Sequence, residues 1–336
     1  MKKFSTYVDE KVFSANKRIV DLQNKTKELF FKCLNDNEDI EYFKEQLEKI
    51  WGKEDYSFMQ DDIEEYIEMI HTNNMEEASK YIQVEDTEEV NKRESLAIYL
   101  VALGLIMTQV NRYKSVINRE YERTRTSPVY QEVKQEYLKK KVQKYNSQTV
   151  PYYSKETGEV IREVQLSTYV AMIENTNLTR SAWNRTLNDA EVVNNTQFYI
   201  PYHNFSCEHC RAYQGRILSR QEVLDYIGIE EEHEGDLLHP NCKCTLLIYW
   251  GGNIRTKLPY TDEELNKQYE IRQKVNSLTL RKSELLTDRR IQKELGNMDQ
   301  VDEVNKKLRA INSKIKDYQA ELPTEELKKQ VVAINR

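Results

Sequence analysis

The sequence is poor in the residues that most often interrupt helices. Its 336 residues include only nine glycines and six prolines, so long uninterrupted helices are expected. The basic start MKKFSTYVDEKVF is not followed by an apolar run, so we expect no signal peptide. The most apolar window, from Leu96 to Val110, is short for a bilayer span and contains Tyr, Thr and Gln. We therefore expect a buried helix there and no membrane anchor.

Cysteine is also scarce, and it is unevenly placed. Four of the five cysteines lie in two short runs, CEHCRAYQGRILS at 207–219 and HPNCKC at 239–244. The fifth, Cys33, falls on a helical apolar repeat and is expected to be a small core residue. Sparse cysteine fits synthesis in a reducing cytosol, because disulfide frameworks belong mainly to small secreted domains.

Charge is abundant but segregated along the chain. Charged residues make up 32% of the sequence and the net charge is −6, which argues against one large apolar core. Residues 36–90 hold nineteen Asp and Glu against four Lys, whereas residues 112–144 hold ten Lys and Arg against four Glu. A chain polarised in this way can present opposite faces to different partners.

Helical periodicity covers both ends of the chain. Apolar residues of 4–34 follow a 3-4 repeat, and a second such repeat runs from Val301 to Leu322. Thr261 followed by Glu264 forms a capping-box pattern, which predicts a helix start. Gly296 and Asn297 predict the end of that helix. The chain therefore ends in a predicted helical hairpin.

The middle of the chain has a different texture. Six of the nine glycines fall between Gly158 and Gly252, and YYSKETGEVIREVQL after Pro151 suits a β-hairpin. A helix is expected from Ser167 to about Asn195. The sequence thus predicts a mainly α fold, in which long helices flank a small α+β core. The expected segments are an N-terminal helical region (1–110, acidic over 36–90), a basic, tyrosine-rich helical segment (111–150), a core with the Cys/His cluster (151–258) and the C-terminal hairpin (259–336).

The cysteine runs have the spacing of a structural zinc site. Cys207-x2-Cys210 brings two thiolates to one tetrahedral ion, and Cys242-x-Cys244 supplies the second half. Because C-x-C is the less regular chelate, His239 is an alternative ligand, which leaves five candidates for four positions. A structural Zn²⁺ would stabilise a loop-rich segment with few large apolar residues. A disulfide or plain buried thiols are the alternatives.

Four of the five histidines (203, 209, 233 and 239) also fall in this region. A metal-dependent nuclease would cluster histidines too, yet no adjacent His pair or acidic Mg²⁺ partner stands at a suitable spacing. His203 and His233 are interpreted as ordinary loop residues. We therefore expect no enzymatic activity.

A basic stretch interleaves Lys and Arg with tyrosines over 112–145. Lys and Arg can neutralise phosphates and tyrosines can stack on unpaired bases. The alternative is a solvated helix whose tyrosines pack on neighbours, against the acidic 36–90 segment. The candidate DNA contacts are Arg123, Arg125, Lys139, Lys140, Lys141 and Lys144.

The cysteine region also resembles a known family. The runs YHNFSCEHCRAYQGRILS and GDLLHPNCKCTLLIYWGG are similar to the tailed-phage minor capsid and head-morphogenesis family, whose members carry xYQGxIxS and HPNC segments. STYVAMIENTNLTRSAWN and YTDEELNKQYEIRQK are similar to the flanking helices of that family. The likeness covers about 150–280, and 1–110 shows none.

The resemblance implies a structural role in the virion and no catalysis. It implies a minor head protein made in the host cytoplasm and placed in the capsid interior or at the portal vertex, with the portal protein and other capsid or scaffold proteins as partners. It also implies a role in head morphogenesis and in the ejection or protection of packaged DNA. In the family, Cys and His interchange at the position of Cys244. Tyr213, Gln214 and Gly215 are expected to form a turn against the core. The alternative is a zinc-braced nucleic-acid-binding protein or nuclease.

Overall fold

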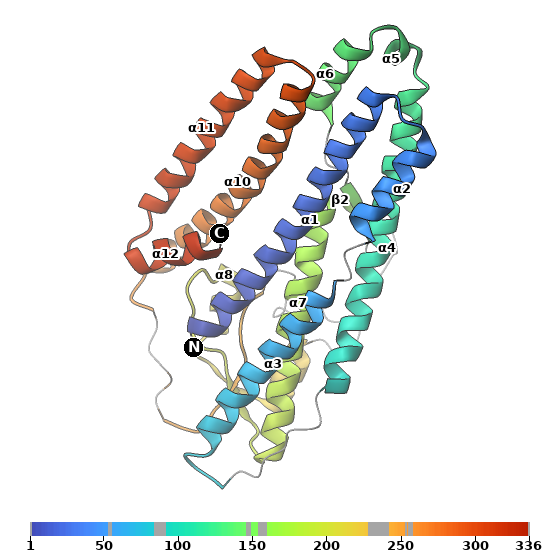
Figure 1. The fold of residues 1–336 in the computed structure, drawn as a ribbon. Coiled ribbons are helices and arrows are strands. Elements are labelled where there is room, and N and C mark those ends of the chain that lie inside the picture. Colours follow the sequence, from blue (N-terminus) through green and yellow to red (C-terminus); the bar gives the residue numbers. More distant parts are fainter. Residues whose placement is uncertain are drawn as a thin grey trace.

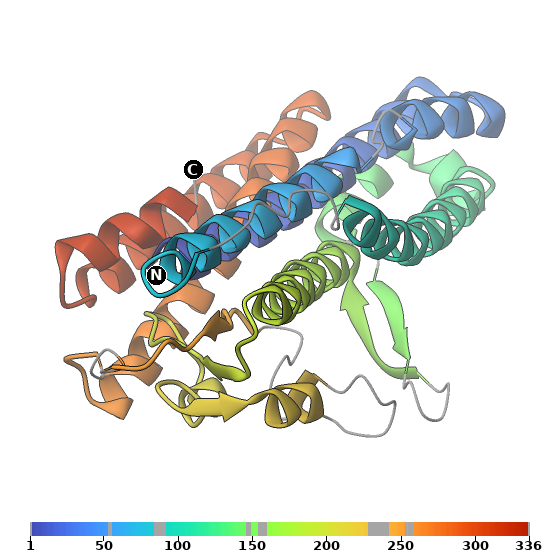
Figure 2. The same cartoon turned by 90° about the horizontal axis from the view of Figure 1, so that it is seen from below.

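The computed structural model describes residues 2–52, 56–83, 92–145, 149–153, 160–227, 242–252, 254 and 258–334. Long helices make up most of this part of the chain, and short strands lie along one side of the helical layers (Figure 1; Figure 2). The predicted mainly α fold with a small α+β core is therefore confirmed. The division into four segments stays a prediction.

The first part of the chain forms helices of very different lengths. They are α1 (Lys2–Asp36), α2 (Ile40–Trp51), α3 (Ser57–Ala78), α4 (Lys92–Arg125), α5 (Pro128–Glu132) and α6 (Lys134–Lys144). The apolar repeat predicted for 4–34 is the buried side of α1, where Ala15, Ile19 and Cys33 are almost fully buried. A continuous apolar core joins α1 to α2, α3, α4 and α6.

Helix α7 (Leu166–Val192) lies at the centre of the molecule. It packs against α1, α3 and α4 (Figure 2), and most of its residues are buried. The hairpin that precedes it pairs β1 (Thr149–Tyr153) antiparallel with β2 (Val160–Gln165). The predicted hairpin and the predicted helix after it are both confirmed.

A second, smaller core surrounds a three-stranded antiparallel sheet. Strand β3 (Gln197–Tyr199) lies between β4 (Ile217–Ser219) and β5 (Leu247–Ile248). The short helices α8 (Glu208–Arg211) and α9 (Arg220–Ile227) flank β4 in the chain. The apolar side chains of this core include Trp183 of α7, Phe198, Leu218 and three of the cysteines, so α7 joins the two cores.

The chain ends in α10 (Asp262–Glu294), α11 (Met298–Ala320) and α12 (Glu325–Ile334). The predicted capping box is present: Thr261 Oγ1 accepts a hydrogen bond from the Glu264 N–H, and the Glu264 carboxylate accepts one from the Thr261 N–H. Helices α10 and α11 form the predicted hairpin (Figure 1). Helix α12 was not predicted; it packs back on α1 and α11.

Helix α4 departs from the sequence prediction. One face is buried, as expected, at Ala102, Ile106 and Val110. The opposite face is exposed, with Leu100 at 54% and Val101 at 66% of their full accessible surface. The prediction of a buried helix is therefore wrong for the outer face, because this helix lies at the edge of the bundle. By length and composition alone, Leu96–Arg125 could cross a membrane.

Candidate metal centre

The segment from Cys242 to Leu246 is held in place by polar side chains of α7. The Cys242 carbonyl accepts hydrogen bonds from Asn175 Nδ2 at 2.8 Å and Thr179 Oγ1 at 3.1 Å. Trp183 Nε1 donates to the Cys244 carbonyl at 2.8 Å, and Thr186 Oγ1 donates to the Leu246 carbonyl at 2.9 Å. These buried bonds satisfy a segment that has no regular strand partner over Cys242–Leu246.

The same segment is fixed from its other side by α1 and α3. Lys243, between the two cysteines, forms an ion pair with Asp9 of α1, and Asp9 also pairs with Arg272 of α10 at 2.5 Å. The Thr245 hydroxyl is 3.1 Å from the hydroxyl of Tyr66 on α3. Burial lowers the pKa of Arg272 to about 10, so its guanidinium remains protonated at neutral pH.

The other pair of cysteines begins helix α8. Cys207 is its N-cap, and the Cys207 Sγ accepts a hydrogen bond from the Cys210 N–H at 3.3 Å. Cys210 is then carried one turn into the helix and points into the small core, where it is 2% exposed. Cys207 stays half-buried at the edge of that core.

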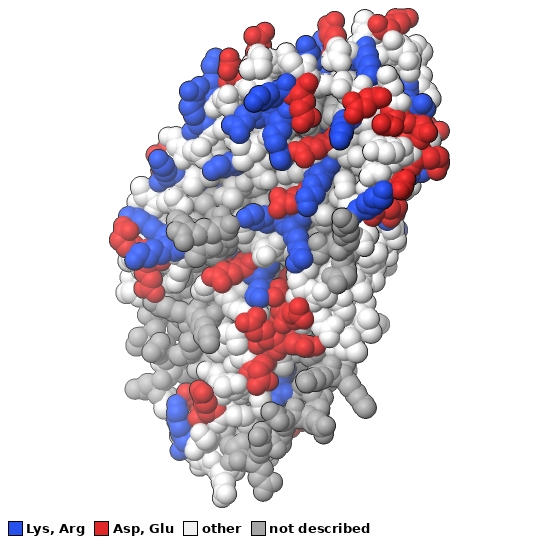
Figure 3. Space-filling view, in the orientation of Figure 1, with Lys and Arg blue, Asp and Glu red and all other residues white. Residues whose placement is uncertain are grey.

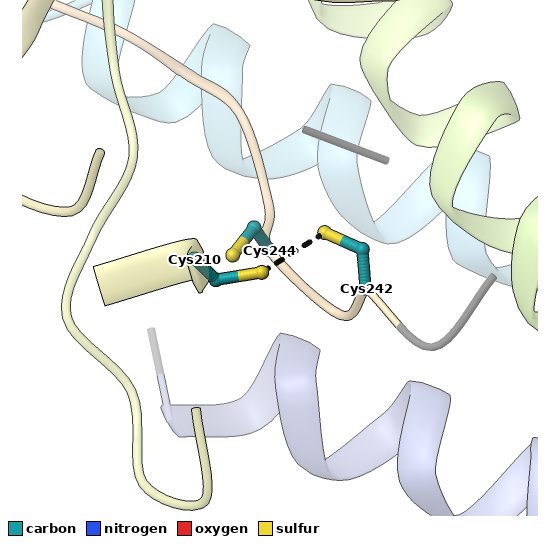
Figure 4. Close-up of side chains that lie close together, drawn as sticks. All are labelled: Cys210, Cys242 and Cys244. Carbon is teal, nitrogen blue, oxygen red and sulfur yellow. Dashed lines mark hydrogen bonds between the residues drawn. The ribbon is translucent and has the colours of Figure 1, made fainter. Parts of the chain in front are cut away.

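Three thiols meet in this small core. The Sγ atoms of Cys210, Cys242 and Cys244 all lie within 4.8 Å of one another, and those of Cys210 and Cys242 are 3.7 Å apart (Figure 4). Hydrogen bonds with neighbouring thiols, first that of Cys207, raise the pKa of Cys210. Within the described ranges, this is the group of His, Cys, Asp or Glu side chains whose ligand atoms cluster tightly enough to hold a metal ion.

His203 is the residue of this site that sequence reasoning missed. Its Nε2 lies 3.5 Å from Cys244 Sγ, and its Nδ1 lies 3.0 Å from the carbonyl of Asn204. Burial lowers the pKa of His203, which favours the neutral ring. Three residues separate His203 from Cys207, and the sequence offered nothing to distinguish it from the other histidines of this region. His209, closer to the cysteines in sequence, is exposed.

The alternative ligand His239 lies outside the described residues. Of the predicted metal ligands, the structure thus brings Cys210, Cys242 and Cys244 together and leaves Cys207 beside Cys210.

The turn expected at Tyr213, Gln214 and Gly215 lies directly against the cysteines. Gln214 Nε2 is 3.9 Å from Cys244 Sγ, and the Gly215 N–H donates to the Ile200 carbonyl at 2.7 Å. Gly215 has a φ of +76°, and an added Cβ would lie 2.5 Å from the ring of Tyr202. Glycine is therefore required here both by conformation and by the close approach.

Replacing Gly215 with alanine should lower the free energy of unfolding by about 1–3 kcal/mol, because a left-handed backbone and a displaced Tyr202 ring both oppose the methyl group. The measurement is chemical denaturation. Gly296→Ala is the control: Gly296 has a φ of +66° but no atom within 4 Å of the added Cβ. An equal loss in the two variants would mean that the contact with Tyr202 contributes nothing.

Comparison with known proteins extends the likeness beyond the cysteine region. The sequence model of the family described as phage minor capsid protein 2 matches residues 17–322. The chain belongs to that family. The match reaches from α1 to the end of α11, so it includes most of the N-terminal region for which the sequence had shown no resemblance. No curated protein and no solved structure matches significantly.

Membership makes this a structural protein of the phage capsid that works in the virion among other virion proteins. The family suggests no enzymatic role.

The basic stretch of this minor capsid protein is less available than its sequence suggests. Lys140 pairs with Glu136 at 2.6 Å and Lys141 with Glu120 at 2.6 Å. Arg123 is exposed on α4, and Arg125 and Lys139 are half-exposed. Lys144 is the last residue of α6. The described contacts do not test whether these six residues meet DNA.

The tyrosines of the basic stretch are mostly structural. Tyr113, Tyr121 and Tyr130 are buried in the main core, and Tyr121 stacks on Phe43 with ring centroids 4.0 Å apart. The prediction that these tyrosines stack on unpaired bases is therefore wrong for these three rings. The alternative, that the tyrosines pack on neighbouring side chains, is confirmed for them. The packing partners come in part from the acidic segment, since Lys114 also pairs with Glu48 at 2.8 Å.

Proposed function

We propose that this minor capsid protein is attached to the portal vertex inside the capsid and takes part in head morphogenesis. The family match over 17–322 is the observation that carries this proposal. A second feature supports it: the outer face of α4 exposes Leu96, Leu100, Val101 and Leu105. Several large apolar side chains exposed on one helix are typical of a protein that docks on another. We place the contact with the portal protein on this face.

The test is particle entry. A phage carrying Val101→Asp should package several-fold less of this protein into purified heads than wild type, because a charge in a desolvated interface is costly. Val192→Asp is the matched control, since Val192 is 51% exposed at the end of α7 and is not part of α4. For each variant, quantitative mass spectrometry measures the amount of this protein in purified heads, and co-purification measures its binding to the portal protein. If the wild-type protein neither enters heads nor binds portal protein, the proposal is wrong.

We also propose that the protein lies against packaged DNA, and protects it or leaves the head with it. The support is the way the fold gathers basic side chains. Helix α6 packs against both α1 and α10, and each of these three helices carries an exposed lysine: Lys140 on α6, Lys32 on α1 and Lys293 on α10. Figure 3 shows most Lys and Arg of this face in its upper half, where Asp and Glu are interspersed among them, and a further group of Asp and Glu below the centre.

The salt dependence of DNA binding tests this surface. Replacing Lys32, Lys140 and Lys293 together by alanine should weaken duplex binding and reduce the slope of log K against log[salt] by up to about 3, since each lost phosphate contact removes about 0.9. The control replaces Lys44, Lys49 and Lys80, which are exposed and paired with Glu as Lys140 is, but which lie in the acidic segment 36–90. Equal salt slopes in the two variants would show that DNA does not bind at these three lysines. Metal-dependent cleavage of the DNA would instead favour a nuclease.

A further inference from the structure

We propose that His203, Cys210, Cys242 and Cys244 together bind one Zn²⁺ ion. This goes beyond the proposed role in the capsid and does not depend on it. The assignment replaces two of the ligand candidates suggested by the sequence, Cys207 and His239, with a histidine that no spacing pattern singles out.

The distances between the thiols suit a tetrahedral ion. With Zn–S bonds of about 2.3 Å, two thiolates on one zinc lie about 3.8 Å apart. The Sγ atoms of Cys210 and Cys242 are 3.7 Å apart, and Cys244 Sγ lies within 4.8 Å of both. Thiolates are soft ligands that favour zinc over the hard cations. The three thiols therefore supply three corners of a site and need a fourth ligand.

His203 stands at the right distance to be that ligand. A zinc-bound imidazole nitrogen and a zinc-bound sulfur lie about 3.6 Å apart, given Zn–N bonds of about 2.0–2.1 Å. His203 Nε2 is 3.5 Å from Cys244 Sγ. The contact is with that one sulfur, so closing the tetrahedron draws the ring toward the other two thiols.

The surroundings of His203 also prepare its ring for a metal. Nδ1 lies 3.0 Å from the carbonyl of Asn204, where it donates its proton and so leaves the lone pair of Nε2 facing the sulfur. A second hydrogen bond of this kind is the usual support of a metal-bound histidine. The ring is 6% exposed, so water has little access to that lone pair.

Cys207 has a different role in this arrangement. It is half-buried, whereas the other three thiols and His203 are buried. Its sulfur accepts the Cys210 N–H at 3.3 Å as the N-cap of α8. That hydrogen bond fixes the first turn of α8 and thereby aims Cys210 at the other thiols. We therefore assign Cys207 as a positioning residue and not as a ligand.

Zinc in this site would join two loops that are far apart in the chain. His203 and Cys210 precede β4, whereas Cys242 and Cys244 follow a long connection. On binding, each of the three thiols releases its proton to solvent and becomes a thiolate bonded to Zn²⁺. Because the ligands are assembled only in the folded chain, the free energy of binding adds to folding stability.

The experiment measures zinc in the full chain, purified under reducing conditions, by elemental analysis. One zinc per chain is expected. Replacement by Co²⁺ should give the visible absorption of a tetrahedral site, with sulfur-to-cobalt charge transfer. A folded chain with no zinc, or one with a Cys210–Cys242 disulfide, overturns the inference. Particle entry is measured separately, so either result leaves the proposed function standing.

Two variants identify the fourth ligand. His203→Ala should weaken zinc binding, measured by competition with a chelator, by at least about 100-fold, the upper end of what loss of a supporting residue costs. Cys207→Ser should weaken it by no more than about 10-fold, the lower end of that range. His209→Ala, which changes an exposed histidine two residues from Cys207, is the matched control and should leave affinity unchanged. Any other order of the three affinities overturns the assignment of His203.

A fourth variant keeps the test decisive if His203→Ala does not fold. His203→Cys should retain zinc and increase the sulfur-to-cobalt charge-transfer absorption, because a fourth thiolate then binds the ion. Unchanged charge-transfer intensity in a folded, cobalt-loaded His203→Cys chain would show that position 203 does not reach the metal.

Discussion

Replacing Asp9 by asparagine should lower the free energy of unfolding by about 3–5 kcal/mol, because the change leaves buried cations without their counter-ion. Asp9 of α1 is 5% exposed and accepts from both Lys243 and Arg272. The asparagine side chain has the same shape, so the loss is electrostatic and creates no cavity. Denaturant unfolding, monitored by helical circular dichroism, measures it.

Two further variants show whether the ion pairs are the cause. Glu321→Gln removes the same charge from a pair with Lys267 in which both side chains are about half exposed, and should cost at most about 1 kcal/mol. Lys243→Met in the Asp9→Asn background should recover part of the loss, since it removes one uncompensated charge. Additive losses from Asp9→Asn and Lys243→Met would show that the two side chains are not coupled.

Truncating Trp183 to alanine should also cost about 3–5 kcal/mol, as is usual for a large buried aromatic side chain. Trp183 is fully buried on α7, where it packs in the small core and its Nε1 donates to the Cys244 carbonyl. The contribution of the apolar packing can be separated from that of the hydrogen bond with Trp183→Phe. That variant keeps most of the apolar contact and leaves the carbonyl without this donor, which costs about 1–3 kcal/mol.

Trp250 provides the comparison for Trp183. It is half-buried and stacks on Tyr81, with ring centroids 5.4 Å apart, so Trp250→Ala should cost clearly less than Trp183→Ala. Calorimetric or denaturant unfolding of the three variants gives the order. If Trp250→Ala were the most harmful, the small core would not be organised around α7.

Features that depend on neighbouring residues in the chain were predictable. The 3-4 repeat identified α1, the Thr261–Glu264 pair identified the start of α10, and the turn at Gly215 followed from a short motif. Each of these is determined within one or two helical turns, so local sequence carries the information. The two cysteine runs were found in the same way, and three of their four thiols do meet.

What the sequence did not reveal depends on pairs of residues far apart. Asp9 and Arg272 are 263 positions apart, and His203 and Cys244 are 41 apart. Neither pair forms a local pattern. The polar positions of α7 that bind the Cys242–Leu246 segment do have a signal, because Asn175, Thr179, Trp183 and Thr186 recur at helical spacing. That signal indicates a shared face, but not what the face binds.

The outer face of α4 shows the limit of composition. A window rich in Leu, Ile and Val predicts burial, yet whether one face stays open depends on how many helices the fold places around it. The arrangement of the neighbouring elements, chiefly α7, α3 and α2, decides which side of α4 is covered.

The contacts of the N-terminal helix have a consequence for synthesis. Helix α1 is made before α10 and α12, against which it packs. The 225 residues between the end of α1 at Asp36 and the start of α10 at Asp262 take roughly 11–45 seconds to make, at about 5–20 residues per second. Until then, the apolar side of α1 lacks part of its final cover. Helix α1 is therefore expected to need protection from aggregation during synthesis, until α10 and α12 are in place.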